Sequence, residues 1–106
     1  MEPITKSARI LIRPPQGLPS ALVVEYLDRC RTSLPLLKAA ADQGQHEQAR
    51  ILGHRMKGTG APYGFSWLTE IGALIEHAAA DHENSDLRKH VAALEEYLSQ
   101  VDIAPE

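Results

Sequence analysis

Apolar residues recur at three- and four-residue steps in four long stretches of this chain, a pattern that predicts amphipathic helices. The stretches cover about residues 19–41, 46–60, 66–81 and 85–101. Only short polar segments or segments with glycine and proline separate them, and short connections favour antiparallel neighbours. No stretch shows a clear strand alternation. The sequence therefore predicts an all-α fold, an antiparallel up-and-down four-helix bundle.

The two ends of the chain are predicted to lie outside this bundle. Residues 1–17 are expected to form an N-terminal arm, residues 18–102 the bundle and residues 103–106 a C-terminal tail. The arm contains the apolar run ILI at residues 10–12, followed by two prolines that hold the backbone extended. This run could be a strand, but the sequence shows no pairing partner for it. We therefore expect an extended or short helical arm that lays apolar side chains across the bundle.

A proline interrupts the first helical stretch. Pro35 has no N–H to donate, and its ring clashes with the preceding turn at a cost of about 3 kcal/mol. We therefore expect a kink or a break near Ser33.

The composition is that of one ordinary domain, and it excludes several kinds of function. The 106 residues are 43% apolar and 24% charged, which is enough for a single core. The net charge is −3, and the basic residues are scattered among acids, so nucleic acid is not an expected partner. No stretch approaches the ~18 to 20 apolar residues of a membrane span. Without a signal-peptide core, and with the single cysteine Cys30, the chain is expected in the reducing cytoplasm.

The second helical stretch carries the residues that bear on function. At about 100° per residue, the side available for burial consists of Ala49, Leu52, Met56 and Thr59. His54 lies on the opposite side, so its ring should face solvent. Arg50, Lys57, Gly58 and Ala61 share the side of His54. The histidine is therefore expected between cationic side chains and a patch of bare backbone.

Glycines are unusually frequent in this helix. Each costs about 0.8 to 1 kcal/mol relative to alanine, so Gly53, Gly58 and Gly60 together give up roughly 2 to 3 kcal/mol. Such a cost suggests that another surface comes close to this helix. The alternative is that the helix ends near Lys57 and that the later glycines form a loop.

The run from His54 to Thr59, HRMKGT, with Gly64 ten residues after the histidine and Phe65 next, resembles the signature of histidine phosphotransfer (HPt) domains. The resemblance is closest over residues 49–79. It implies a four-helix bundle that passes a phosphoryl group to or from the aspartate of response-regulator receiver domains, or accepts one from a histidine kinase. The partners it implies are a receiver domain, a hybrid histidine kinase, or both.

The resemblance also implies roles for single residues. His54 would be the phosphoacceptor, Lys57 would neutralise the phosphoryl oxygens, and Glu76 would hydrogen-bond the other imidazole nitrogen and orient the ring. For Lys57 the alternative is a solvated surface lysine, and for Glu76 a solvated helix edge. Gly58 would leave a gap for the partner. From helix position alone, Arg50, Ile51 and Ala61 would form part of the docking surface around His54, and we expect Arg55 and Gly58 to belong to it as well.

No metal site or cofactor site is expected in the chain itself. The other histidines (His46, His77, His82 and His90) include no pair at the i,i+3 or i,i+4 spacing that would place two ligands on one helix face. The glycines match no nucleotide-binding loop. By resemblance, magnesium is expected only in the receiver partner, and the chain is a phosphoryl carrier and not an enzyme.

Two functional hypotheses remain from the sequence. The first is a phosphorelay intermediate that is phosphorylated on His54, and the second is a helical adaptor that binds a receiver or kinase domain without carrying phosphate. A histidine, a lysine and a glycine at this spacing favour the first, because an adaptor needs no nucleophile beside a cation. A weaker alternative is one domain of a larger kinase, against which Met1 argues mildly. The apolar stripes are about what a four-helix core consumes, which favours a monomer.

Overall fold

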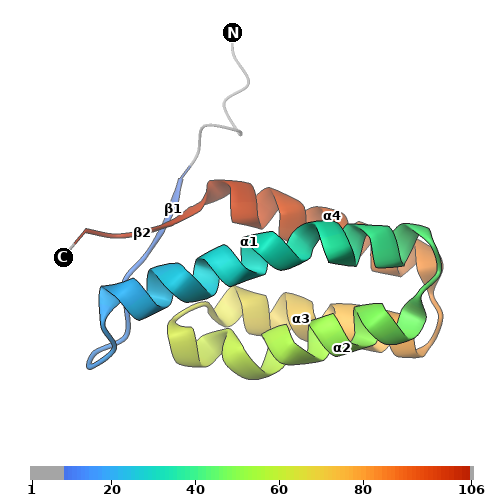
Figure 1. The fold of residues 1–106 in the computed structure, drawn as a ribbon, viewed down its shortest axis with the longest axis horizontal. Helices are drawn as coiled ribbons and strands as arrows, with labels where there is room; N and C mark the ends of the chain where they lie inside the picture. Colours follow the sequence, from blue (N-terminus) through green and yellow to red (C-terminus); the bar gives the residue numbers. More distant parts are fainter. Residues whose placement is uncertain (1–8, 106) are drawn as a thin grey trace, which may run out of the picture.

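A computed structural model of the protein describes residues 9–105, in which four helices pack around one apolar core (Figure 1). The elements are β1 (Ile10–Ile12), α1 (Ser20–Asp42), α2 (His46–Thr59), the 3₁₀ turn η2 (Ala61–Tyr63), α3 (Ser66–Ala80), α4 (Asn84–Gln100) and β2 (Val101–Ile103). Helix α1 contacts α2 and α4, and α3 contacts the same two helices from the other side. The predicted all-α four-helix bundle is confirmed. The part of the predicted arm before Arg9 lies outside the described residues.

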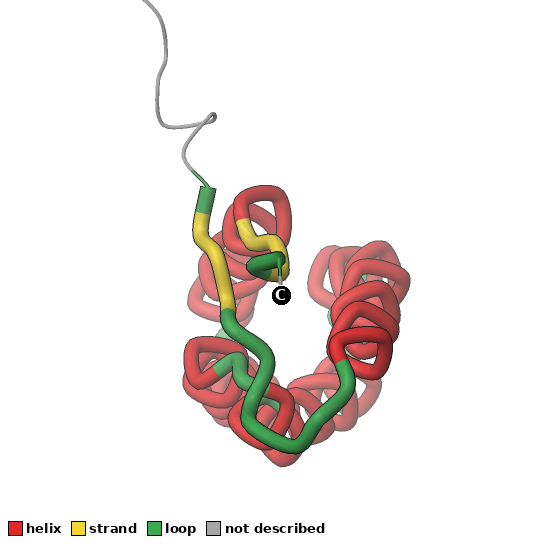
Figure 2. Tube along the Cα trace, turned by 90° about the vertical axis from the view of Figure 1, so that its left-hand side faces the viewer, coloured by secondary structure: helices red, strands yellow, loops and turns green. Residues whose placement is uncertain are grey.

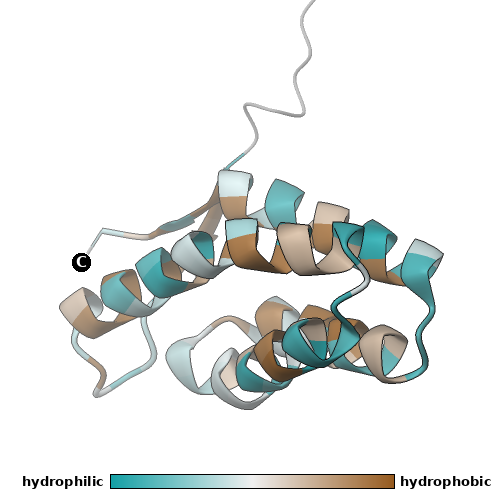
Figure 3. Ribbon diagram, turned by 45° about the vertical axis from the view of Figure 1, so that its right-hand side comes forward, coloured by the Kyte–Doolittle hydropathy of each residue, from teal (hydrophilic) through white to brown (hydrophobic). Residues whose placement is uncertain are grey.

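The core contains the apolar side of each helix (Figure 3). The largest side chains that are almost completely buried are Phe65, Leu27, Leu37, Leu68, Ile75, Leu87, Leu94 and Val23. They come from α1, α3, α4 and the turn before α3, while α2 contributes the buried residues Ala49, Leu52 and Met56. Burying side chains of this size contributes about 1.5 to 3 kcal/mol each, so packing of these stripes outweighs the weak intrinsic stability of single helices.

Of the two outcomes expected at Pro35, a kink or a break, the break is wrong, because α1 runs without interruption through the proline. Residues on both sides of the proline are buried, with Leu27 and Cys30 before it and Leu37 and Ala40 after it. Their burial offsets the local cost of the missing hydrogen bond. The helix ends where predicted, and Gly44 follows its C-terminus with a φ of +68°, a conformation that glycine adopts without strain.

The apolar run at residues 10–12 has a partner after all. It forms β1, which pairs in parallel with β2 in the register Ile10 to Val101 and Ile12 to Ile103. The sequence hid this partner because Val101 continues the apolar stripe of α4 and was assigned to that helix. The two strands lie side by side at one end of the bundle (Figures 1 and 2). The loop after β1 then crosses that end to reach α1 (Figure 2).

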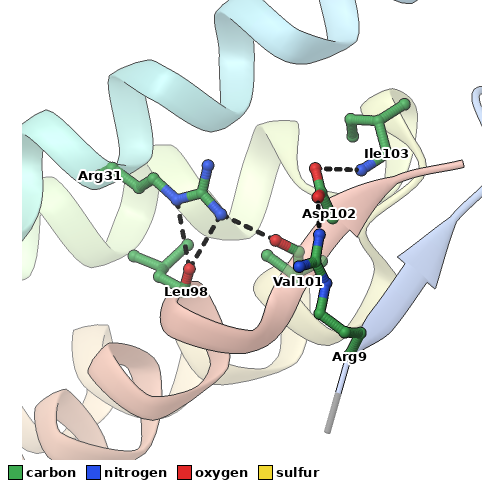
Figure 4. A network of polar contacts seen from close by, with 6 residues as sticks. All are labelled: Arg9, Arg31, Leu98, Val101, Asp102 and Ile103. Carbon is green, nitrogen blue, oxygen red and sulfur yellow. Dashed lines mark hydrogen bonds and ion pairs between the residues drawn. The ribbon is translucent and has the colours of Figure 1, made fainter. Parts of the chain in front are cut away.

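Two arginines hold β2 in place (Figure 4). Arg31 on α1 donates hydrogen bonds to the carbonyl oxygen of Leu98, at 3.2 and 3.0 Å, and to that of Val101, at 2.7 Å. Carbonyls at the end of a helix lack helical partners, so a guanidinium placed there satisfies them. Arg9 forms an ion pair with Asp102 on the other side of the strand. The chain end is thereby fixed against α1 and β1.

Some large apolar side chains remain exposed outside the core. Leu22 and Leu36 on α1 are 43% and 55% exposed, and Ile51 on α2 is 36% exposed. The core therefore leaves some large apolar side chains of α1 and α2 at the surface. The monomeric state stays a prediction.

Candidate functional site

The site begins with a close contact between α2 and α3 at two glycines. A Cβ atom on Gly53 would lie 2.8 Å from the backbone nitrogen of Glu76, and one on Gly72 would lie 2.6 Å from the backbone nitrogen of Lys57. Real Cβ atoms do not approach backbone this closely, so only glycine fits at either position. The glycines allow the two helix backbones to touch, and this brings side chains of α3 within reach of those on α2.

The carboxylate of Glu76 joins the two predicted functional residues of α2. Its Oε2 atom lies 2.9 Å from Nδ1 of His54, and its Oε1 atom lies 2.8 Å from Nζ of Lys57. The Glu76 side chain is only 20% exposed, whereas that of His54 is 62% exposed. One half-sheltered carboxylate therefore holds an imidazole and an ammonium group at the protein surface.

The contact with Glu76 decides which imidazole nitrogen can react. A carboxylate only accepts hydrogen bonds, so Nδ1 carries the proton and donates a hydrogen bond to Oε2. In the neutral ring, Nε2 then carries the lone pair, and it has no hydrogen-bond partner among residues 9–105. The geometry presents an oriented nucleophile to solvent with a cation beside it.

The model of the Hpt domain family matches residues 21–104, which is most of the chain. The chain belongs to the Hpt domain family. Its members carry phosphoryl groups in two-component signalling, and they interact with receiver domains and kinases in phosphorelays. Comparison with curated proteins and with solved structures gave no match. The family predicted from the HRMKGT run and its spacing is thus confirmed.

The structure brings together most of the residues expected around His54 in this Hpt domain. Arg50 is half-buried and forms an ion pair with Glu47 at 2.7 Å, while Arg55 is exposed. Ile51 is exposed as well, and a Cβ atom on Gly58 would meet nothing within 4 Å. A patch of bare backbone therefore does lie beside the histidine, as the sequence predicted.

One expectation drawn from helix geometry is wrong, and it concerns Thr59. Ala61 is exposed and lies just beyond α2, which ends at Thr59, and begins the 3₁₀ turn η2. Thr59 is exposed instead of buried, and its hydroxyl donates to the carbonyl oxygen of Arg55 at 2.7 Å. It also lies 2.9 Å from the hydroxyl of Tyr26. The error arises at the last residue of the helix, whose hydroxyl bonds to its own helix and to α1.

The sequence did not single out Gly72, although this residue sets the distance between the helices. A signal was present, because Gly72 interrupts the apolar stripe of α3 directly after Ile71. A glycine within a helix is costly, and it suggests close approach of another backbone.

The pKa of the Glu76 carboxyl is lowered, first by the hydrogen bond from Lys57 and then by that from His54. A carboxylate with a lowered pKa in the folded protein stabilises the fold above its unfolded pKa of about 4.3, and this stabilisation is lost as the pH falls through the lower folded value. We therefore expect the stability that the native chain holds over Glu76→Gln to be lost as the pH falls below about 4.3. Urea unfolding of both proteins between pH 3 and 7 measures this difference in unfolding free energy. A difference that does not decrease between pH 4.3 and 3 would contradict the assignment to Glu76.

Residues 9–105 contain no group of three or more His, Cys, Asp or Glu side chains that could hold a metal ion. Within the same residues, no helix is long and apolar enough to cross a membrane.

Proposed function

We propose that this Hpt domain accepts a phosphoryl group on Nε2 of His54 and passes it to or from the aspartate of a receiver domain. The observation that supports this most strongly is the double contact of Glu76, which binds Nδ1 of His54 and Nζ of Lys57 with its two oxygens. That arrangement leaves Nε2 as the exposed nucleophile.

In the direction from receiver to Hpt domain, the lone pair of Nε2 attacks the phosphorus atom of the aspartyl phosphate. The new N–P bond forms as the P–O bond to the aspartate breaks, and the aspartate leaves as a carboxylate. The proton on Nδ1 stays in place, so the phosphorylated ring becomes cationic. The Glu76 carboxylate stabilises that positive charge, and reversal of the same step returns the phosphoryl group to an aspartate.

Lys57 supplies positive charge for the phosphoryl oxygens. Phosphoryl transfer depends mainly on positioning and on fixed charge near those oxygens. The Lys57 side chain is 43% exposed and reaches the same carboxylate that His54 contacts. Because both groups contact one carboxylate, the ammonium of Lys57 is held close to the imidazole of His54.

The proposal makes the domain a carrier and not an enzyme, with no cofactor of its own. The partner is a receiver domain, a hybrid histidine kinase, or both, and the receiver supplies magnesium and the catalytic groups. We propose that the domain works as a monomer in the cytoplasm, where the buried thiol of Cys30 stays reduced.

Phosphoryl transfer from a panel of phosphorylated receiver domains of the same cell tests the proposal. Intact mass should show that the native chain gains one acid-labile phosphoryl group. If receivers bind the chain but none transfers phosphate to it, the proposal fails and an adaptor function is supported.

Two substitutions of Glu76 distinguish its effect on the orientation of the His54 ring from the effect of its negative charge. An orienting partner of an imidazole contributes about 10- to 100-fold in metal sites, and we expect a loss of transfer rate in this range for Glu76→Ala. Glu76→Gln can still accept the proton of Nδ1 but removes the charge that stabilises the cationic ring, so its loss should be smaller. Rapid-quench kinetics measures both rates.

The tautomer of His54 shows whether Glu76 orients the ring, because a purely structural role of Glu76 would not change it. Nitrogen NMR should show Nδ1 protonated in the native chain and a mixture of tautomers in Glu76→Ala. Glu70→Gln, at an exposed glutamate of the same helix, is the matched control and should behave like the native chain. Equal rates for Glu76→Ala and the control would show that Glu76 is only a surface residue.

A further inference from the structure

A groove of about 290 Å³ separates α1 from α2 on the side of His54 that faces away from Glu76. The residues that matter here are Tyr26, Arg29 and Cys30 on α1 and Leu52, Arg55 and Met56 on α2. Four of them are apolar or aromatic and almost completely buried, so they form a floor. The two arginines are exposed and stand at the rim.

The positive charge at this rim is only partly compensated within residues 9–105. Arg55 has no ion-pair partner among residues 9–105, and Arg29 has only a long contact of 3.9 Å with Glu25. On the other side of His54 the cations are already paired, Arg50 with Glu47 and Lys57 with Glu76. The groove side is therefore the side of His54 that attracts negative charge.

The surface between His54 and the groove is open. Gly58, Ile51 and Arg55 lie at about 40°, 60° and 100° from His54 around α2, all in the direction of the groove. A Cβ atom on Gly58 would meet nothing within 4 Å, so no side chain there separates the histidine from the groove. A protein that covers His54 can extend across this surface without obstruction.

Exposed apolar side chains lie on α1 and α2 near the same groove. Leu22, Arg29, Ser33 and Leu36 are spaced by seven, four and three residues, which places them along one side of α1. Leu22 and Leu36 are exposed, as is Ile51 on α2. Apolar groups outside the core that surround a groove indicate a surface for another protein.

We propose that this groove receives an apolar side chain of the receiver domain, flanked by carboxylates, and that Arg29 and Arg55 determine which receivers bind. The inference rests on the proposed function, because the receiver that reaches His54 is the occupant. The apolar floor takes a side chain whose burial favours binding, and the two guanidinium groups select partners with acidic residues beside it. Charges at the rim of an interface act mainly on partner choice and association rate.

Charge reversal tests the proposal directly. The double variant Arg29→Glu/Arg55→Glu changes two exposed side chains, so its fold should be retained. Its matched control is Arg88→Glu/Lys89→Glu, which makes the same change in net charge at two exposed positions of α4. Binding of each receiver of the panel to both variants and to the native chain is measured by fluorescence anisotropy near physiological salt.

We expect the dissociation constant of the groove variant to rise roughly tenfold or more, and that of the control to change by less than about twofold. Ser33→Trp, which fills the groove from α1 without a change of charge, should also weaken binding. Equal affinities for the groove variant and the control would overturn the inference, and so would a panel in which no receiver binds the native chain. Loss of a native dimer in the groove variant, seen by sedimentation, would overturn it too, because the occupant would then be a second copy.

The same panel separates this inference from the proposed function. If receivers bind the native chain, depend on Arg29 and Arg55, and still transfer no phosphate, the groove stands and the phosphoryl-transfer role of His54 fails. If transfer to His54 occurs but the groove variant binds as well as the native chain, the proposed function stands and the groove has no part in it.

Discussion

His54→Gln is expected to abolish phosphorylation of the chain while leaving its fold intact. The imidazole is 62% exposed, and its single described contact is the hydrogen bond to Glu76. Glutamine is at least as favourable as histidine within a helix, so we expect stability to change by less than about 0.5 kcal/mol. The side-chain amide is not a nucleophile toward an acyl phosphate. Intact mass after incubation with phosphorylated receivers should therefore show no added phosphoryl group.

A matched control is available on the neighbouring helix. His77 on α3 is also exposed, and its Nε2 atom lies 3.1 Å from Oδ2 of Asp81. This contact engages the Nε2 atom, the nitrogen that acts as the nucleophile in His54. His77→Gln should be phosphorylated like the native chain. If His54→Gln still gains an acid-labile group, another residue is the acceptor, and the assignment of His54 fails whatever the binding data show.

The sequence predicted best those features that depend on the geometry of a single helix. His54, Lys57 and Gly58 lie within five residues, so the regular geometry of a helix places them on one side before anything is known of the fold. The same periodicity failed at the last residue of α2, because Thr59 is exposed although it was expected on the buried side. It failed again at Val101, which continues the stripe of α4 but pairs with Ile10.

Relations between distant segments were harder to predict, for a physical reason. The pairing of β1 with β2 joins residues about ninety positions apart, and no local pattern records it. The position of Glu76 next to His54 depends on how closely α2 and α3 approach, and two glycines set that distance. From the sequence alone, Glu76 was equally consistent with an orienting residue and with a solvated surface residue.

Substitution by alanine is expected to lower the stability of the domain at Gly72 and to raise it at Gly58. In Gly72→Ala the new methyl group would meet the backbone of Lys57 at 2.6 Å and that of Gly53 at 2.8 Å, and backbone cannot move aside as a flexible side chain can. Overpacking of this kind costs about 1 to 3 kcal/mol, and it opposes a gain in helix propensity of about 0.8 to 1 kcal/mol. The strain should separate α2 from α3, which also lengthens the contacts of Glu76. We therefore expect lower stability in urea unfolding together with slower phosphoryl transfer.

Gly58→Ala is the informative counterpart, since a methyl group there meets nothing within 4 Å. Alanine is favoured over glycine inside a helix by about 0.8 to 1 kcal/mol, so this variant should be more stable than the native chain. It should nevertheless accept phosphate more slowly, because the methyl group stands on the open surface beside His54 that the receiver must cover.

A Gly72→Ala protein as stable as the native chain would show that the helices are not in contact there. A Gly58→Ala protein with unchanged transfer would show that the partner does not approach across that surface, and would direct attention to the α3 side of the histidine.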